Sequence, residues 1–177
     1  MVNSLDLAVN AFMQSIQTPF SVKLMSAITF IGDVKVLLPL SILLVLYLFY
    51  KKENLKSSLI ASTLILGVLT SETLKFLVSR ARPENALMKL SDYSFPSGHV
   101  LMSTLFFLLV IYLFKNSMKD KVLRKLFITM LIIIPILISF SRLYLNVHWL
   151  TDVIAGIIIG IFWTALFIKI NNLETKR

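Results

Sequence analysis

The feature that most constrains this chain is a series of five long apolar runs, which cover roughly residues 34–50, 57–78, 99–114, 123–144 and 149–168. In a lipid bilayer a helix satisfies its own backbone hydrogen bonds, so apolar runs of this kind are stable there as helices. Several uncharged cores are shorter than the ~20 residues that a full span requires, so polar residues at their ends should lie at the membrane boundary. The sequence therefore predicts an all-α, integral membrane helical bundle with five clear transmembrane helices.

Composition supports this class. Hydrophobic residues make up 57% of the chain, charged residues only 15%, and the mean hydropathy is +0.84, whereas soluble domains are about 25% charged. The net charge of +9 does not indicate nucleic-acid binding, because the basic residues bracket the apolar runs instead of forming a stripe with interleaved aromatics. The absence of cysteine excludes disulfides, thiolate nucleophiles and Cys-ligated metals.

Three regions differ in character. Residues 1–32 mix apolar residues with Asn, Gln and Pro, a pattern typical of one or two amphipathic helices that lie in the membrane interface. Residues 33–170 form the predicted transmembrane bundle, and residues 171–177 form the predicted cytoplasmic tail. A sixth span within the first region stays an alternative.

The distribution of Lys and Arg predicts the orientation of the chain. If the spans alternate in direction, the basic segments at residues 51–56, 115–125 and 169–177 share one face. The positive-inside rule assigns that face to the cytoplasm. We therefore expect a multi-pass protein of the cell membrane, with the opposite ends of the spans facing the extracytoplasmic side.

Three polar clusters lie at those opposite ends, and the first is Lys75 with Arg82. Because they are seven residues apart, a continuous helix would place them on one face about two turns apart, before Pro83 ends the helix. The alternative is that both side chains only snorkel to the bilayer edge.

The second cluster is the segment from Pro96 to His99. Ser97 is a good N-cap residue, and Gly98 allows a ligand to approach the backbone. Unpaired amides at a helix N-terminus, together with the helix dipole, form an anion site. A simple cap, with His99 at the interface because its ring is amphipathic, explains the same residues.

The third cluster contains Arg142, His148 and Asp152. On a helix, His148 and Asp152 meet because they are four residues apart. A carboxylate bonded to one imidazole nitrogen fixes the tautomer and leaves the other nitrogen basic, and the Arg142 guanidinium suits phosphate. An interfacial histidine with a capping Asp is the alternative.

Alternation of the spans brings all three clusters to the same face of the membrane. Ionisable residues at membrane depth are costly and mark functional sites by default. A pocket with three fixed positive charges favours a dianion, of which phosphate is the natural example.

The same residues resemble the three-part signature of the type-2 phosphatidic-acid phosphatase superfamily. The matching motifs are Lys75-(six residues)-Arg82-Pro83, Pro96-Ser97-Gly98-His99 and Ser141-Arg142-(five residues)-His148-(three residues)-Asp152. One departure is that bacterial membrane members commonly have six spans, whereas this chain is predicted to have an amphipathic segment in place of the first span.

The resemblance implies a role for each residue. His148 is the expected nucleophile, Asp152 its orienting partner, and His99 the acid and then the base. The expected phosphate-binding residues are Lys75, Arg82, Ser97, Gly98 and Arg142. Neither a metal nor another cofactor is expected.

The expected function is hydrolysis of a lipid phosphate, through a phosphohistidine, at the extracytoplasmic face. The candidate substrates are undecaprenyl diphosphate, phosphatidylglycerol phosphate, phosphatidic acid and the 1-phosphate of lipid A. The partners are then the substrate and membrane lipids, with no nucleic acid; the sequence does not indicate the oligomeric state. Two alternatives are phosphotransfer from lipid to lipid at the same site and a non-catalytic phosphate-binding relic.

Overall fold

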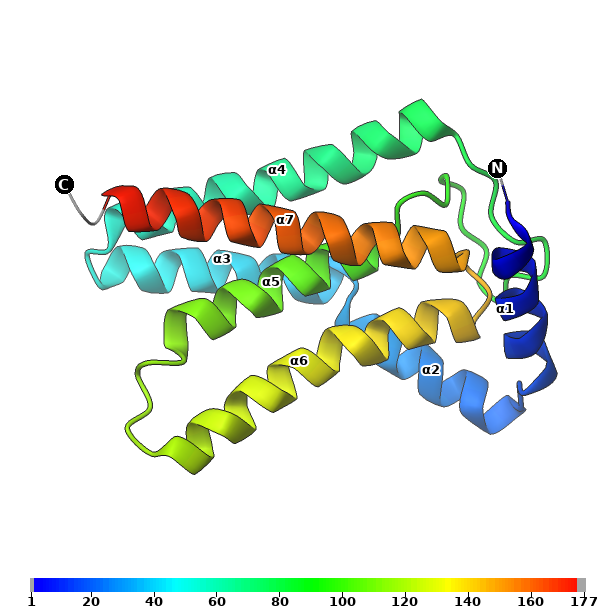
Figure 1. The fold of residues 1–177 in the computed structure, drawn as a ribbon, viewed down its shortest axis with the longest axis horizontal. Helices are drawn as coiled ribbons and strands as arrows, with labels where there is room; N and C mark the ends of the chain where they lie inside the picture. The colour runs from blue at the N-terminus through cyan, green and yellow to red at the C-terminus, as the bar shows by residue number, and fades with distance from the viewer. Residues whose placement is uncertain (1, 175–177) are drawn as a thin grey trace.

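The computed structural model describes residues 2–174, and this part of the chain is helical without any strand. Figure 1 shows the helices, whose bounds are α1 Ser4–Ser15, α2 Pro19–Ile31, α3 Val34–Tyr50, α4 Asn54–Val78, α5 Gly98–Phe114, α6 Lys121–Tyr144 and α7 Leu150–Glu174. The five predicted spans correspond to α3 to α7. The predicted all-α membrane bundle is confirmed.

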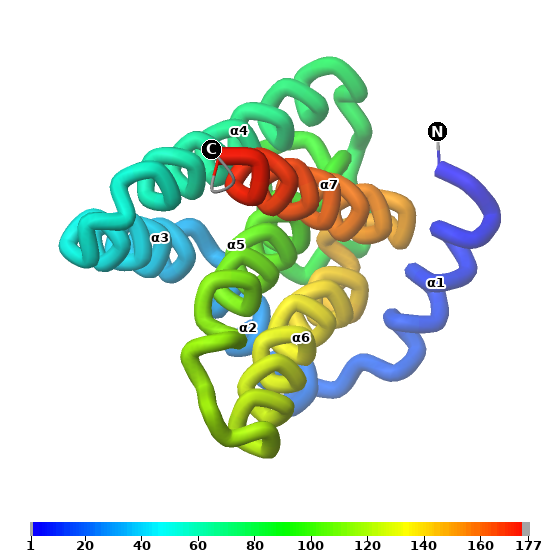
Figure 2. Tube along the Cα trace, turned by 60° about the vertical axis from the view of Figure 1, so that its left-hand side comes forward, coloured from blue at the N-terminus to red at the C-terminus, as the bar shows by residue number. Residues whose placement is uncertain are grey.

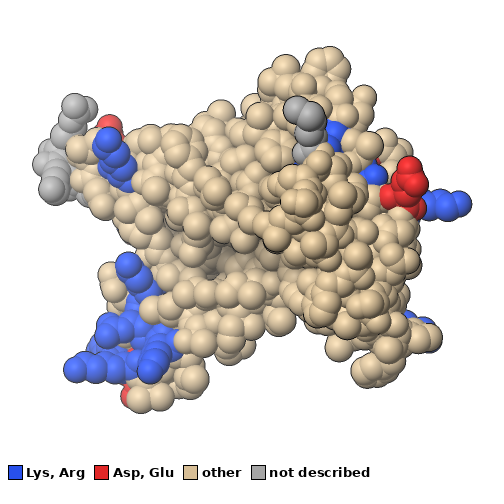
Figure 3. All heavy atoms as spheres, turned by 45° about the vertical axis from the view of Figure 1, so that its right-hand side comes forward, with Lys and Arg blue, Asp and Glu red and all other residues tan. Residues whose placement is uncertain are grey.

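In the described part of the chain, four stretches are long and apolar enough to cross a membrane: Pro19–Tyr50, α4, α6 and α7. The remaining predicted span, α5, is apolar but has only 17 residues. In Figure 3 the charged side chains lie towards the two ends of the molecule, with Lys and Arg at both ends, and an uncharged band lies between them. The protein is thus a multi-pass membrane protein.

The first 32 residues form two helices with clear start signals. Asn3 caps α1 in a reciprocal capping box with Asp6, and Thr18 does the same for α2 with Ser21. In Figure 1, α1 lies across the end of the bundle, while α2 packs against α6. Only two residues, 32 and 33, separate α2 from α3. The interfacial placement of this region stays a prediction.

The predicted boundary at residue 171 does not coincide with a helix end. The last helix, α7, continues through Glu174, and residues 175–177 of the predicted tail lie outside the described part of the chain.

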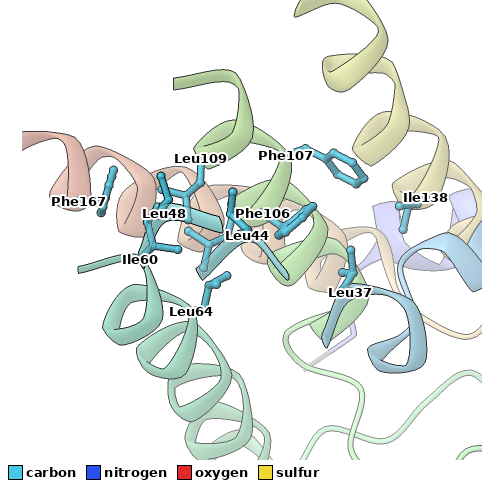
Figure 4. Close-up of a cluster of buried hydrophobic side chains, with 11 residues drawn as sticks. Leu37, Leu44, Leu48, Ile60, Leu64, Phe106, Phe107, Leu109, Ile138 and Phe167 are labelled. Carbon is cyan, nitrogen blue, oxygen red and sulfur yellow. The ribbon is translucent and has the colours of Figure 1, made fainter. Parts of the chain in front are cut away.

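Helix α5 is the centre of the bundle, and Figure 2 shows it among α3, α4, α6 and α7. Buried apolar side chains from all five helices form the main core around it (Figure 4). Leu109 and Leu105 of α5, for example, are fully buried. The core thus holds α5 in a fixed position relative to the spans on every side.

Helices α5 and α7 pack with their backbones close together, and two glycines make this possible. A Cβ atom at Gly156 would lie 2.9 Å from the Ser97 carbonyl oxygen, and one at Gly160 would lie 2.9 Å from the Leu101 carbonyl oxygen. Small residues spaced four apart let helix backbones approach closely in membranes. This contact places the first turns of α5 and α7 side by side.

We predict that Gly156→Ala destabilises the protein by about 1–3 kcal/mol, because the added methyl overpacks against backbone atoms that cannot rotate away. The matched control is Gly67→Ala on α4. Its Cβ would meet the ends of the Leu105 and Met102 side chains, at 2.7 and 3.3 Å, which can rearrange. Thermal unfolding in detergent should show a lower Tm for Gly156→Ala than for Gly67→Ala. Equal Tm values would contradict the importance of the α5–α7 contact.

Candidate active site

A cavity of about 560 Å³ lies at the end of the bundle where α4 ends and α5 begins. All three polar clusters contribute to its wall. The predicted site residues that line it are Lys75, Arg82, Gly98, His99, Arg142 and His148. The other two, Ser97 and Asp152, are fully buried. The structure therefore brings together six of the eight predicted residues around one cavity.

The expectation that Lys75 and Arg82 share a helical face is wrong. Helix α4 ends at Val78, and Ser79 adopts a left-handed conformation with φ 47°. Arg82 therefore lies in the loop between α4 and α5. There it donates from Nη1 to the Val147 carbonyl at 2.6 Å, which attaches the loop to the segment that carries the third motif.

Asp92, which sequence reasoning missed, bridges the two cations of the first cluster. Its carboxylate lies 2.7 Å from Lys75 Nζ and 2.8 Å from Arg82 Nη2. Burial alone would raise the pKa of Asp92, but hydrogen bonds and charges from Lys75 and Arg82 lower it to about 2. Glu72 also pairs with Lys75, at 2.9 Å, although its own side chain is 61% exposed.

Arg142 is a buried cation, with only 1% of its surface exposed. Its Nη1 donates to the Thr29 hydroxyl of α2 at 2.9 Å, and its Nε has no hydrogen-bond partner. Among the residues described, it has no salt-bridge partner. A buried charge without a counter-ion is costly, so an anion in this cavity would stabilise the site.

His148 lies in the turn between α6 and α7 and has one polar partner on each ring nitrogen. Nδ1 donates to the Ser94 carbonyl at 2.8 Å, and Nε2 lies 3.1 Å from Arg82 Nη1. Burial lowers the pKa of His148 to about 4; the Arg142 and Arg82 charges act in the same direction, and Asp152 opposes them. The ring is therefore neutral near pH 7, with an unprotonated Nε2 facing Arg82.

The expected hydrogen bond between His148 and Asp152 is not formed. Asp152 Oδ2 lies 3.6 Å from His148 Nδ1, which is beyond hydrogen-bond distance. The reason is that α7 begins only at Leu150, so His148 is not on the helix. Asp152 instead accepts the Trp149 N–H at 2.9 Å and pairs with Arg80.

The second cluster, the segment from Pro96 to His99, does not form the simple helix cap that was the alternative explanation. Ser97 occupies the N-cap position of α5, but its hydroxyl makes no capping bond and is buried without a partner. The Ser71 hydroxyl, on the cavity wall, is also buried and unpaired. A Cβ on Gly98 would lie 3.3 Å from Ser71 Oγ and 3.8 Å from Lys75 Nζ. The glycine thus lets the Ser71 hydroxyl approach the helix start closely, whereas a Cβ would make only an ordinary contact with Lys75.

His99 lies beside a carboxylate that the sequence did not reveal as part of the site. The Oδ2 atom of Asp33, the N-cap residue of α3, is 3.6 Å from His99 Nε2. Asp33 and Ser94 each contact a histidine of a distant segment. Asp92 contacts Arg82 within the same loop and Lys75 at the end of α4. A lone acidic residue at a predicted helix start, such as Asp33, was the only local signal for any of them.

No group of three or more His, Asp or Glu side chains among the described residues is arranged to hold a metal ion. Metal independence stays a prediction.

Residues 56–176 match the PAP2 superfamily, which is 121 of the 177 residues. The chain belongs to this superfamily. It is 28% identical to phosphatidylglycerophosphatase B from Bacillus subtilis, over 99% of this chain and 86% of that protein. It is also 28% identical to an undecaprenyl-diphosphatase from Sulfolobus acidocaldarius, over 72% of this chain and 61% of that protein.

Two solved structures share the fold. One is a transmembrane PAP2-type phosphatidylglycerolphosphate phosphatase from Bacillus subtilis, with a TM-score of 0.86 and 27% identity, covering 96% of this chain and 85% of that one. The other is LpxE from Aquifex aeolicus, with a TM-score of 0.74 and 24% identity, covering 94% of this chain and 96% of that one. The family match and the relatives at 27–28% identity confirm the predicted family and, at a general level, the predicted enzyme class of phosphate hydrolases, whereas the LpxE structure supports the fold alone.

We predict that Asp92→Asn binds orthovanadate, a phosphate-shaped anion, about threefold to tenfold more tightly, equivalent to ~1 kcal/mol. The reason is that the Asp92 carboxylate pairs with Lys75 and Arg82, two cations on the cavity wall that would otherwise attract an incoming anion. Calorimetry on the purified protein measures the Kd. Glu84→Gln, the same loss of charge at an exposed position, is the control. Weaker binding in Asp92→Asn would show that Asp92 positions the cations and does not compete for them.

Proposed function

We propose that this protein is a membrane-embedded lipid phosphate phosphatase. The observation that carries the proposal is the two-part character of the cavity. One end has the cations and histidines described above, including the arginine of α6 that has no carboxylate partner among the described residues. Most of the rest of the wall is apolar and comes from α3 and α4, where the lining includes Leu37, Leu38, Ile65, Val68 and Leu69. A phosphate attached to a hydrocarbon chain matches both parts.

Phosphatidylglycerol phosphate is the first substrate to test, since the relative that aligns with almost the whole chain is named for it. Undecaprenyl diphosphate follows, because a second relative is named for that lipid. Phosphatidic acid and the 1-phosphate of lipid A complete the set, because each also presents a phosphate at the membrane surface.

In the proposed first step, His148 Nε2 attacks phosphorus. A P–N bond forms, the P–O bond to the lipid breaks, and His99 gives a ring proton to the leaving oxygen. His148 is prepared for this role because its Nδ1–H is donated to the Ser94 carbonyl, which leaves Nε2 unprotonated. The Nε2 lone pair accepts a hydrogen bond from Arg82 Nη1 at 3.1 Å, and it becomes available when the phosphate binds that arginine. The Ser94 carbonyl also stabilises the positive ring that forms.

In the second step, water attacks the phosphohistidine. His99 removes a proton from the water, the new P–O bond forms, and the P–N bond breaks to release phosphate and neutral His148. The phosphoryl oxygens would be held by Lys75, Arg82, Arg142, Ser97 and the Gly98 amide. Phosphoryl transfer depends mainly on such positioning and charge stabilisation, and each fixed donor can contribute roughly 10²-fold. No step requires a metal.

We predict that the purified protein in detergent releases phosphate from at least one of the four lipids and that His148→Ala abolishes the release. Activity should survive a chelator, since the proposed steps use only side chains. Asn116→Ala, a change at an exposed position in the α5–α6 turn, is the control and should retain full activity. Full activity in His148→Ala would overturn the mechanism, and transfer of phosphate to a second lipid without release would indicate phosphotransfer.

We further propose that the cavity faces the extracytoplasmic side of the cell membrane. Because the chain has no native cysteine, single cysteines can report the orientation in intact cells. We predict that an impermeant thiol reagent labels Glu84→Cys, in the exposed α4–α5 loop beside the cavity, but not Asn116→Cys at the other end of α5. The reverse labelling pattern would place the site on the cytoplasmic side.

A further inference from the structure

The strongest unexplained feature outside the predicted site is a buried carboxylate near the N-terminus. Asp6, on α1, has no exposed surface. One oxygen accepts the backbone N–H of Thr151 at 3.0 Å, the other pairs with Arg80 Nη2, and the Thr151 hydroxyl lies 3.0 Å from both. These contacts attach α1 to the first turn of α7, which is distant along the chain.

Arg80 connects Asp6 with Asp152. Its Nη1 donates to the Asp152 carboxylate and to the Thr151 hydroxyl, and its guanidinium lies over the Trp149 ring at 5.7 Å. Arg80 is 8% exposed and Asp152 is fully buried. A buried arginine between two carboxylates forms a network in which each charge depends on the others. Burial alone would raise the pKa of Asp6, but the bonds from Thr151 and Arg80 keep it below its ordinary value, so Asp6 stays ionised.

This network reaches His148 by two routes. In the first, the Arg80 carbonyl accepts the Ser94 N–H at 2.9 Å, and the Ser94 carbonyl accepts Nδ1–H of His148 at 2.8 Å. In the second, Asp152 pairs with Arg80 through Oδ1 and accepts the Trp149 N–H through Oδ2, which fixes the residue that follows His148. Both routes orient the same imidazole ring.

We propose that Asp6 is a positioning residue for the proposed nucleophile: by holding Arg80 and Thr151, the N-terminal helix α1 fixes the tautomer and orientation of His148. This inference rests on the proposed function. It gives α1 a part in catalysis, beyond any contact of its exposed apolar residues with lipid.

A purely structural explanation has to be separated from this one, because Asp6 also belongs to the capping box of α1. The Asp6 N–H donates to Asn3 Oδ1 at 2.8 Å, and the Asn3 N–H donates to Asp6 Oδ2 at 3.4 Å. Asn3→Ala therefore removes the side-chain oxygen that accepts the Asp6 N–H and leaves the Asp6 carboxylate in place. It is the matched control for Asp6→Asn, which keeps the shape of the side chain but removes its charge.

The kinetic experiment compares these two variants with the native chain on the lipid that it hydrolyses. We expect Asp6→Asn to lower kcat by about 10- to 100-fold, the range found when outer hydrogen-bond partners of metal ligands are removed. KM should stay constant, since Asp6 does not line the cavity. Asn3→Ala should lower kcat by less than about threefold. Equal losses in the two variants would overturn the proposal.

A second readout does not depend on turnover. The chain has only two histidines, so ¹⁵N-histidine NMR of the protein in detergent shows both rings, and comparison with His99→Asn assigns them. In the native chain, His148 should be the neutral Nδ1–H tautomer. Asp6→Asn should change the His148 signals and leave those of His99 unchanged. Unchanged His148 signals, or equal changes in both rings, would contradict a positioning role.

If Asp6→Asn does not fold, Thr151→Val decides the question. It removes the hydroxyl that joins Asp6 and Arg80 but adds no charge imbalance, so we expect the same NMR change and a kcat loss of about threefold to tenfold. An unaltered kcat and His148 signal would overturn the inference. Failure of the proposed function would look different: the native chain would release no phosphate from any of the four lipids, whatever the NMR spectra show.

Discussion

The contact on which the rest of this structure depends is the backbone approach between α5 and α7 at Gly156 and Gly160. A Cβ atom at either position would lie 2.9 Å from a carbonyl oxygen of the facing helix, so a larger residue would push the two helices apart. At the cavity end of this contact, the Ser97 N–H donates to the Asp152 carbonyl at 3.1 Å. The second and third motifs are therefore joined through main-chain atoms, and the relative position of their side chains does not depend on flexible groups.

Charge balance is the second constraint on the site. Lys75 and Arg82 share one carboxylate, that of Asp92, and Arg80 lies between two. Arg142 has no acidic partner among the described residues. The cations thus fall into two groups. Arg80 is part of the scaffold because both of its carboxylates are fully buried, whereas the cations on the cavity wall can exchange a partner for an anion because Asp92 is 43% exposed. Arg80 therefore holds the site together, whereas the cations on the cavity wall are available to bind an anion.

Much of this arrangement could be predicted from the sequence, because apolar runs and short motifs are local patterns. The errors came from assuming that a helix continues through a motif: Arg82 follows the end of α4 and His148 precedes the start of α7, so neither lies on the expected helical face. Apart from Asp92, which pairs with Arg82 in the same loop, the residues that sequence reasoning missed act between distant segments. Ser94 meets His148 across 54 positions, and Asp6 meets Thr151 across 145. The partner of a buried polar group is determined by the folded path of the chain, so local residue types carry no signal for it.

The length of α5 explains why such a polar site can exist in a membrane protein. At 1.5 Å per residue its 17 residues extend only about 26 Å, less than the ~30 Å hydrocarbon core of a bilayer. Of the helices around it, α4, α6 and α7 have 24 or 25 residues each, and α3, like α5, has 17. The α5 N-terminus, which the loop of residues 79–97 connects to α4, can therefore lie below the ends of the three longer helices. Gly98 and His99, which are half-buried, then lie below the ends of the longer helices, so a polar site can form inside an otherwise apolar bundle.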